Sequence, residues 1–229
     1  MSGALHAIIF DFDGVIANSE PLHMMAFQHV LHEEGVELTP TAYYAQYLGF
    51  DDAGVFEAIA RDRGLAMSKA DVASLVVRKG DRMEAMLHSG AVLFPGAIEF
   101  IREAAAAVPI GIASGAQRHE IVEIISGAGI VDLFSAVVAS GDTPESKPSP
   151  GPYRLAFERL CAAAGRQLDP RRSVAIEDSR WGLESAQGAG LRLVGVTTSY
   201  PAHDLIGAEL IVSGLDGLTL AALDRLCGD

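Results

Sequence analysis

Short runs of apolar residues recur along the chain with the length of buried strands. They lie at residues 7–10, 109–113, 136–139, 173–176 and 193–196, and more weakly at 210–212. Runs that are apolar at every position are typical of parallel strands that are covered on both faces. Helical patterns separate most of these runs and lie at residues 97–107, 119–126, 152–164 and 181–187. Strands that alternate with helices predict an α/β fold built on a parallel sheet with right-handed crossovers.

The stretch from residue 18 to residue 92 follows a different pattern, because it contains no convincing strand. Helix start and stop signals, such as Pro21, Pro40 and Gly64, predict helices at residues 19–35, 39–49, 55–63 and 68–88. A Phe-Pro-Gly sequence at residues 94–96 returns the chain to the sheet. We therefore predict a core domain made of residues 1–17 and 93–229, with a helical domain inserted at residues 18–92.

Composition and charge disfavour several classes of protein. The formal net charge of the 229 residues is −13 without a basic cluster, which argues against binding to nucleic acid or acidic lipid. No apolar run approaches the roughly 20 residues of a membrane span, and the residues before Ala7 lack the basic start of a signal peptide. Cys161 and Cys227 lie far apart, as expected for reduced packing residues. We predict a cytoplasmic protein without nucleic-acid or membrane partners.

Polar residues follow four of the predicted strands. In an open parallel sheet, the carboxyl ends of the strands form the edge at which ligands bind. The residues at these ends are Asp11 and Asp13 after the first run, Ser114 and Gly115 after the second, Lys147 in the loop after the third, and Glu177 and Asp178 after the fourth. Their convergence from four separate places predicts a functional site, because each element alone is a weaker signal.

Asp11 and Asp13 have the spacing of a catalytic pair. Alternate residues of a strand point the same way, so both carboxylates can face one site, and Gly14 allows the backbone to approach a ligand closely. One carboxylate can attack phosphorus and form an aspartyl phosphate, while the other protonates the leaving oxygen and then takes a proton from water. The alternative is a pair of acids that caps the following helix.

The other strand ends add acids, a lysine and a helix start. Four carboxylates at one edge repel one another unless a cation lies among them, and hard oxygen ligands suit Mg²⁺. The alternative for Asp178 is a helix cap. Lys147 would offset the acidic charge and stabilise a phosphoryl group, unless it is a solvated surface lysine. Ser114 and Gly115 are expected to open a helix whose N-terminus holds phosphate, and the alternative is that Ser114 is only its N-cap.

Taken in order, these motifs resemble those of the haloacid dehalogenase superfamily. They read Asp11-Phe12-Asp13-Gly14-Val15, Ala113-Ser114-Gly115, Ser146-Lys147-Pro148 and Ile176-Glu177-Asp178-Ser179, and the resemblance covers essentially the whole chain. It implies a Rossmann-like core with a mobile helical cap. The implied roles are Asp11 as nucleophile, Asp13 as general acid and base, Ser114 and Lys147 on phosphate, and Mg²⁺ on Asp11, the Asp13 carbonyl and Asp178, with Glu177 close by. Dehalogenases of the superfamily lack the second aspartate, so Asp13 favours phosphoryl transfer.

Within the superfamily, the chain is most similar to the β-phosphoglucomutase subgroup and its phosphatase relatives, through residues 18–23 and 182–190. His23 corresponds to a histidine at the entry to the cap in that subgroup, and Lys79 to a cap lysine that faces the core. The sequence leaves a helix-surface histidine and a solvated lysine equally open. Arg118 can meet a second phosphate or a carboxylate, or it can lie exposed on the surface.

One stretch departs from the mutase pattern. Where the mutase has basic residues that hold a remote phosphate, this chain reads Leu48-Gly49-Phe50-Asp51-Asp52, and the two acids are expected to repel a second phosphate. Gly49 remains a candidate cap residue. The preferred function is therefore a Mg²⁺-dependent phosphatase that acts on a small phosphorylated metabolite, such as a sugar phosphate. The alternatives are a sugar-phosphate mutase and a non-catalytic binding module. A monomer is expected, because the cap must open and close freely.

Overall fold

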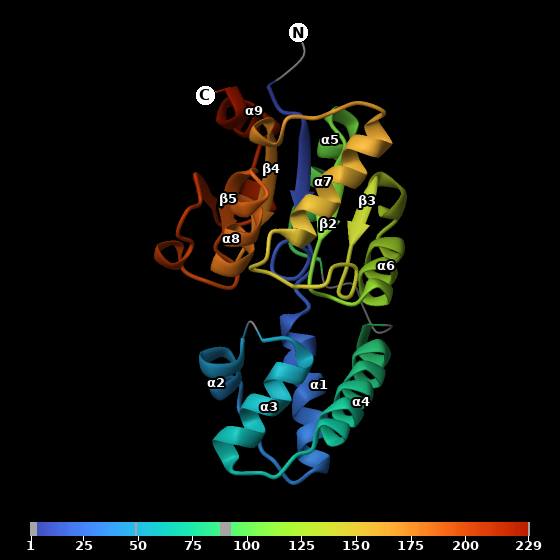
Figure 1. The fold of residues 1–229 in the computed structure, drawn as a ribbon, viewed down its shortest axis with the longest axis vertical. Coiled ribbons are helices and arrows are strands. Elements are labelled where there is room, and N and C mark those ends of the chain that lie inside the picture. Colours follow the sequence, from blue (N-terminus) through green and yellow to red (C-terminus); the bar gives the residue numbers. More distant parts are fainter. Residues whose placement is uncertain (1–3, 49, 88–92, 229) are drawn as a thin grey trace. The chain divides into compact units, whose positions relative to one another are not determined.

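The computed structural model describes residues 4–48, 50–87 and 93–228 of the chain. The chain divides into two compact units, one made of residues 1–18 and 91–229 and the other of residues 19–90. Figure 1 shows the first unit as a sheet covered by helices and the second as a group of helices. The chain leaves and re-enters the first unit at one place. Ala17 and Leu93 form an antiparallel bridge there, and the Phe94 N–H donates to the Ile16 carbonyl at 3.0 Å.

The first unit is built on a six-stranded sheet with the strand order β3-β2-β1-β4-β5-β6, in which every pair is parallel. The strands are β1 Ala7–Phe10, β2 Ile110–Ala113, β3 Ala136–Val138, β4 Ser173–Glu177, β5 Arg192–Val196 and β6 Leu210–Val212. The middle strand β1 pairs with β2 through Ile8 and Ile110, and with β4 through Ile8 and Val174. The α/β parallel sheet is confirmed, and each strand end lies within one residue of the predicted run.

Helices cover both faces of this sheet. They are α5 Ala97–Ala107, α6 Arg118–Gly127, α7 Gly151–Ala164, α8 Arg180–Gly188 and α9 Leu220–Gly228. Alternation along β1 separates the two faces. Ile9 belongs to a core cluster with Tyr153 of α7 and Leu183 of α8. The Phe10 ring instead meets the Phe100 ring of α5 edge-on, with 6.2 Å between the centroids. The short helix α9 has no counterpart among the predicted elements.

The regular elements described in the second unit are helices. They are α1 Glu20–Glu33, α2 Pro40–Ala42, which continues into a π-helical turn at Tyr43–Tyr47, α3 Asp52–Arg63 and α4 Lys69–Leu87. The core of this unit gathers around Phe27. Its ring centroid lies 5.2 Å from that of Phe56 and 5.8 Å from that of Tyr43. Aromatic packing between α1, α3 and the π-helical turn therefore joins segments that are distant in the sequence.

The helix predicted at residues 39–49 is shorter than expected. Its last hydrogen bond runs from the Leu48 N–H to the Tyr43 carbonyl at 3.1 Å, and Leu48 then adopts a non-helical ψ of 129°. Gly49, the predicted end of this helix, lies outside the described residues, and so does His88, the predicted end of α4.

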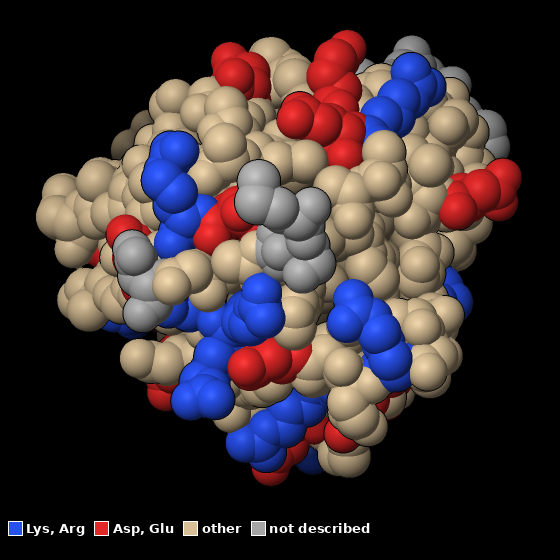
Figure 2. Space-filling model, turned by 90° about the horizontal axis from the view of Figure 1, so that it is seen from above, with Lys and Arg blue, Asp and Glu red and all other residues tan. Residues whose placement is uncertain are grey.

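No helix within the described ranges is long and apolar enough to cross a membrane. The face of the molecule in Figure 2 carries basic and acidic side chains near one another, on a chain whose formal net charge is −13. Ion pairs on the first unit include Arg192 with Glu209 at 2.8 Å and Arg171 with Asp169 at 3.7 Å. The absence of nucleic-acid and membrane partners stays a prediction.

Replacing each of two glycines of the second unit with alanine should change the free energy of unfolding in opposite directions. Gly64 ends α3 with φ at 65°, Gly80 lies inside α4, and a Cβ at either position would meet no atom within 4 Å. Gly64→Ala should lower the free energy of unfolding by about 1 kcal/mol, because an L residue is strained at positive φ. Gly80→Ala should raise it by up to about 1 kcal/mol, because alanine favours the helix. Urea unfolding measures both changes, and equal stabilisation by both variants would contradict the left-handed end of α3.

Candidate active site

The carboxyl ends of β1 and β4 bring three carboxylates together. The Asp11 N–H donates to the Ile176 carbonyl of the neighbouring strand at 2.9 Å, so Asp11 lies level with Glu177 and Asp178. One oxygen from each of the three carboxylates lies within 4.8 Å of the others. The three residues are 9%, 0% and 6% exposed, respectively. Clustered carboxylate oxygens are ligands that a hard divalent cation prefers, so this donor set fits a metal site.

Lys147 brings positive charge to these acids. Its Nζ lies 2.6 Å from Oε1 of Glu177 and 2.9 Å from Oδ1 of Asp11. Burial lowers the pKa of the Lys147 ammonium, but the charges of Asp11 and Glu177 more than offset this and hold it above its usual value. The ammonium therefore stays protonated. The side chain is only 13% exposed, so the alternative of a solvated surface lysine is wrong.

One ammonium does not balance three buried acids. Burial, followed by the negative charge of Glu177, raises the pKa of Asp11 well above its usual value. The same two causes raise the pKa of Asp178 from 3.8 to about 7, and the charge of Asp13 adds to the increase. Asp13 therefore lies near the site, although it is not one of the three clustered carboxylates. A bound cation would relieve this repulsion.

The turn after β1 packs against Asp178. Gly14 has a φ of 78°, and a Cβ at this position would lie 1.8 Å from Oδ2 of Asp178, so only glycine fits. The Thr198 hydroxyl donates to the Gly14 carbonyl. A hydrogen bond from Ser199 lowers the pKa of Asp178, against the larger effect of burial. Neither hydroxyl is among the predicted site residues. Both residues follow the carboxyl end of β5. The rule that ligands bind beyond the strand ends would therefore have identified them as candidates.

The end of β2 differs from the prediction in where its helix begins. Helix α6 starts at Arg118 with Gln117 as its N-cap, so the alternative that Ser114 is the N-cap is wrong. Ser114 is 4% exposed, and its Oγ accepts from the Ala116 N–H at 3.0 Å. Gly115 is exposed beside it. The strand therefore ends in a short turn of its own before the helix.

Arg118 pairs with a carboxylate of its own unit. One of its guanidinium nitrogens lies 2.5 Å from Oδ2 of Asp142 and 3.1 Å from the Val137 carbonyl. Arg159 of α7 donates to the same carboxylate oxygen at 3.0 Å. The structure therefore contains the carboxylate partner, and Arg118 is also exposed, as in the alternative of a surface arginine.

The second unit holds a buried lysine of its own. Lys79 is 0% exposed, and its Nζ lies 2.6 Å from Nδ1 of His23 and 2.8 Å from Oδ1 of Asp52. The alternative of a solvated lysine is therefore wrong. Burial, and then the charge of Lys79, lower the pKa of His23 to about 3. The imidazole is neutral, so Nδ1 accepts from the ammonium and Nε2 carries the proton.

The two acids after Phe50 are engaged within the second unit. Asp51 caps α3 by accepting from the Gly54 N–H at 2.8 Å. Asp52 pairs with Lys79 through both carboxylate oxygens, at 2.8 and 3.0 Å. The charge of Asp52 is offset by a cation that lies 27 residues away in the sequence, which removes part of the expected repulsion of a second phosphate. Gly49, the remaining candidate of this stretch, lies outside the described residues.

Comparison with known proteins identifies the family. A protein-family model described as haloacid dehalogenase-like hydrolase matches residues 8–196, which include Asp11, Lys147 and Asp178. The chain belongs to this family. Protein CbbY from Cereibacter sphaeroides is 32% identical, and the match covers 95% of this chain and 98% of that protein. Hexitol phosphatase B from Escherichia coli is 29% identical, and the match covers 93% and 94% of the two chains.

A solved structure supports the same family. A variant of CbbY from Rhodobacter sphaeroides, in complex with xylulose-(1,5)bisphosphate, matches this hydrolase with a TM-score of 0.84 and 27% identity over 96% of this chain and 99% of that one. The Rossmann-like core and the superfamily are thereby confirmed. Similarity to phosphatases across nearly the whole chain also confirms the expected enzyme class, a hydrolase of phosphate monoesters that acts on small phosphorylated metabolites.

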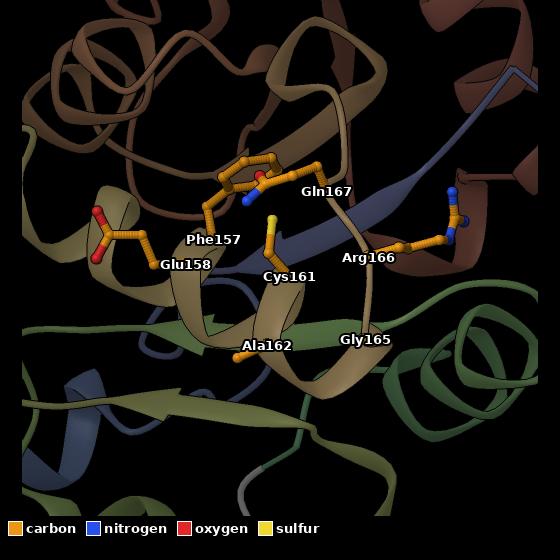
Figure 3. Close-up of a pocket in the computed structure, with 7 residues that line it drawn as sticks. All are labelled: Phe157, Glu158, Cys161, Ala162, Gly165, Arg166 and Gln167. Atoms are coloured by element: carbon orange, nitrogen blue, oxygen red, sulfur yellow. The ribbon is translucent and has the colours of Figure 1, made fainter.

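A surface pocket of the hydrolase is separate from the acidic cluster. Figure 3 shows it along the second half of α7, where it is lined by Phe157, Glu158, Cys161, Ala162, Gly165, Arg166 and Gln167. The first turns of α7 instead reach the cluster, because the Tyr153 hydroxyl donates to Oε1 of Glu177 at 2.8 Å. Sequence reasoning missed Tyr153, since one polar group inside an amphipathic helix has no distinctive spacing.

Without a bound cation, the acidic cluster should destabilise the hydrolase at neutral pH. The pKa of Asp178 is higher in the folded chain, so the folded state binds this proton more tightly, and stability falls as the pH rises from 3.8 to about 7. Asp178→Asn should raise the unfolding temperature at about pH 8 in EDTA by several degrees, and the gain should shrink at about pH 4.

Asp132→Asn is the matched control, because it removes the same charge from an exposed position. Thermal unfolding of the two variants and the wild type at both pH values gives the comparison. If Asp178→Asn were no more stable than Asp132→Asn at the higher pH, repulsion within the cluster would not be the dominant effect.

Proposed function

We propose that this hydrolase is a Mg²⁺-dependent phosphatase that transfers the phosphoryl group of a small phosphorylated metabolite to Asp11. The observation that carries the proposal is the position of Lys147, whose ammonium lies between Asp11 and Glu177. A phosphate monoester is an anion and would be repelled by three carboxylates alone. A fixed ammonium beside the nucleophile offsets this repulsion and stabilises the charge of the phosphoryl group during transfer.

Asp11 performs the first step. Its Oδ1 already accepts from the Phe12 N–H at 2.7 Å and lies 2.9 Å from the Lys147 ammonium, so we assign the attack to Oδ2. A bond forms between this oxygen and phosphorus while the bond from phosphorus to the substrate oxygen breaks. Lys147 donates to a phosphate oxygen with its remaining N–H, and the Ser114 hydroxyl with the turn at Gly115 binds the phosphate at the end of β2.

Asp13 transfers the protons in both steps. It first protonates the leaving oxygen of the substrate. It then takes a proton from the water that attacks phosphorus, which releases inorganic phosphate and returns the Asp11 carboxylate. The influence of Asp13 on the pKa of Asp178 supports this role, because it requires that Asp13 lie near the site.

Asp11 and Asp178 are the carboxylate ligands in our proposal for Mg²⁺, and Asp13 contributes its main-chain carbonyl. The ion supplies positive charge that neutralises the acids and the phosphoryl oxygens when it is bound. Glu177 lies beside this donor set, but its Oε1 already accepts from Lys147 and Tyr153. The raised pKa values of Asp11 and Asp178 support a metal site here, because they reflect burial together with negative charge that the protein alone does not balance.

The proposed substrate is a phosphorylated sugar or sugar alcohol. The similarity to hexitol phosphatase B and to a CbbY variant bound to xylulose-(1,5)bisphosphate supports this class. We assign substrate selection to the second unit as a cap, with His23 and Lys79 as contributing residues. The neutral His23 imidazole offers an Nε2–H donor of the kind that binds a hydroxyl. We also propose a cytoplasmic monomer, free of nucleic acid and membrane, in keeping with a net charge of −13.

Asp11→Asn should abolish phosphate release, because an amide does not attack phosphorus. We expect turnover to fall about 10⁴-fold or more. ³¹P NMR of the protein with Mg²⁺ and a panel of sugar and sugar-alcohol monophosphates measures inorganic phosphate directly. Asp132→Asn serves again as the control, and an unchanged unfolding profile shows that the variant is folded. If neither the wild type nor Asp11→Asn turned over any ester of the panel, the binding-module alternative would replace the proposal.

The same measurement separates the phosphatase from the mutase. Incubation with β-glucose 1-phosphate and a trace of the corresponding bisphosphate should yield inorganic phosphate with little isomer. The comparison is needed because the pairing of Asp52 with Lys79 removes part of the argument against a second phosphate. Conversion of the sugar phosphate into its isomer without free phosphate would contradict the phosphatase proposal and establish the mutase.

A further inference from the structure

Tyr153 contacts both members of the ion pair that flanks Asp11. It lies near the start of α7 and is 0% exposed. Its hydroxyl donates to Oε1 of Glu177 at 2.8 Å, and the Lys147 Nζ lies over its ring, 5.0 Å from the centroid. Burial and the charge of Glu177 raise the pKa of the Tyr153 hydroxyl well above its usual value, so it remains a donor.

The hydroxyl of Tyr153 completes the hydrogen bonding of Glu177. Oε1 accepts from Tyr153 and from Lys147, the latter at 2.6 Å. Oε2 accepts from the Asp178 N–H at 3.2 Å, from the Ser179 N–H at 3.3 Å and from the Ser179 hydroxyl at 3.2 Å. A carboxylate offers about four lone-pair positions. Glu177 is therefore held from both sides and cannot rotate without losing bonds in a buried place, where lost bonds are expensive.

The fixed carboxylate in turn fixes the lysine. Lys147 has three N–H groups. One points to Oε1 of Glu177 and one to Oδ1 of Asp11, which leaves one for a phosphoryl oxygen. Packing alone does not require the hydroxyl at position 153, because phenylalanine would fill nearly the same volume and still place a ring under the ammonium. The hydroxyl adds one directed hydrogen bond to Oε1 of Glu177, which is the same oxygen that accepts from Lys147.

We propose that Tyr153 is a positioning residue for phosphoryl transfer, which acts through Glu177 to aim Lys147 at the phosphoryl group on Asp11. The inference rests on the proposed function. It names a group that does not touch the substrate and that lies outside the four sequence motifs. Groups that orient a metal ligand typically change activity by about 10-fold to 100-fold when they are removed, and we expect an effect of comparable size here.

Tyr153→Phe tests the role of the hydroxyl, with p-nitrophenyl phosphate as the probe substrate and saturating Mg²⁺. We expect kcat to fall about 10-fold with KM nearly unchanged, because the aim of Lys147 matters most when charge moves during transfer. Tyr47→Phe is the matched control. Tyr47 is also buried, at 4% exposed, and its hydroxyl donates to a carboxylate oxygen of Asp62 at 3.2 Å. The two variants should show similar unfolding temperatures, but only Tyr153→Phe should lose activity.

A double-mutant cycle with Lys147→Ala distinguishes positioning from a general structural effect. If Tyr153 acts through Lys147, Tyr153→Phe should have no further effect on kcat/KM once the lysine has been removed. A general loosening of the fold would reduce both backgrounds by the same factor. Independent, multiplicative losses would therefore overturn the proposal. So would a Tyr153→Phe protein that keeps the kcat of the wild type.

The order of the measurements keeps this inference separate from the proposed function. Wild-type turnover of p-nitrophenyl phosphate that is lost in Asp11→Asn first establishes the phosphatase. Given that result, an unaltered kcat in Tyr153→Phe overturns only the role of Tyr153. If Asp11→Asn kept the wild-type turnover, the proposed function would fail, and the positioning role would fail with it.

Discussion

Repulsion between buried carboxylates is the constraint on which the first unit depends. The parallel register of β1 and β4 places Asp11 beside Glu177, in a place with little water to screen their charges. Lys147 relieves part of this repulsion, yet it follows β3, which lies two strands away from β1 in the sheet. The loop after β3 therefore has to pass the end of β2 to reach the acids. Helix α7 then runs back over the sheet, and its first turns bring Tyr153 to the same ion pair.

The second unit also contains a buried charge, which is offset by different partners. Lys79 is fully buried, and its charge is offset by Asp52 and by a neutral His23. Removing a lysine from water is unfavourable, and an ion pair rarely repays the whole loss. We therefore expect the largely buried Lys147 of the first unit and the fully buried Lys79 of the second to contribute direction and specificity more than stability. The lysine of the first unit is next to acids whose arrangement fits a metal site, whereas that of the second holds one tautomer of a histidine.

Patterns that repeat along the chain were readable from the sequence, and contacts between distant residues were not. Strands such as β1 are apolar at every position because both faces are covered, and that signal needs no knowledge of partners. The strand-end rule likewise gathered Asp11, Lys147 and Asp178 from separate places. The pairing of Asp52 with Lys79, and of Tyr153 with Glu177, depends on packing between elements. Spacing along the sequence carries no trace of such pairs.

The way the chain leaves and re-enters the first unit bears on how such enzymes diversify. Ala17 and Leu93 are bridged to each other, and Phe94 is bonded to Ile16, so the two crossing points lie side by side. An insert attached in this way can change its length or sequence without shifting the register of β1, which carries Asp11. On the proposed assignment of substrate selection to the insert, changes within it can alter the substrate while the reactive groups stay in place. If the insert selects the substrate, as we propose, the bridged positions Ala17 and Leu93 are suitable points for exchanging one insert for another in the laboratory.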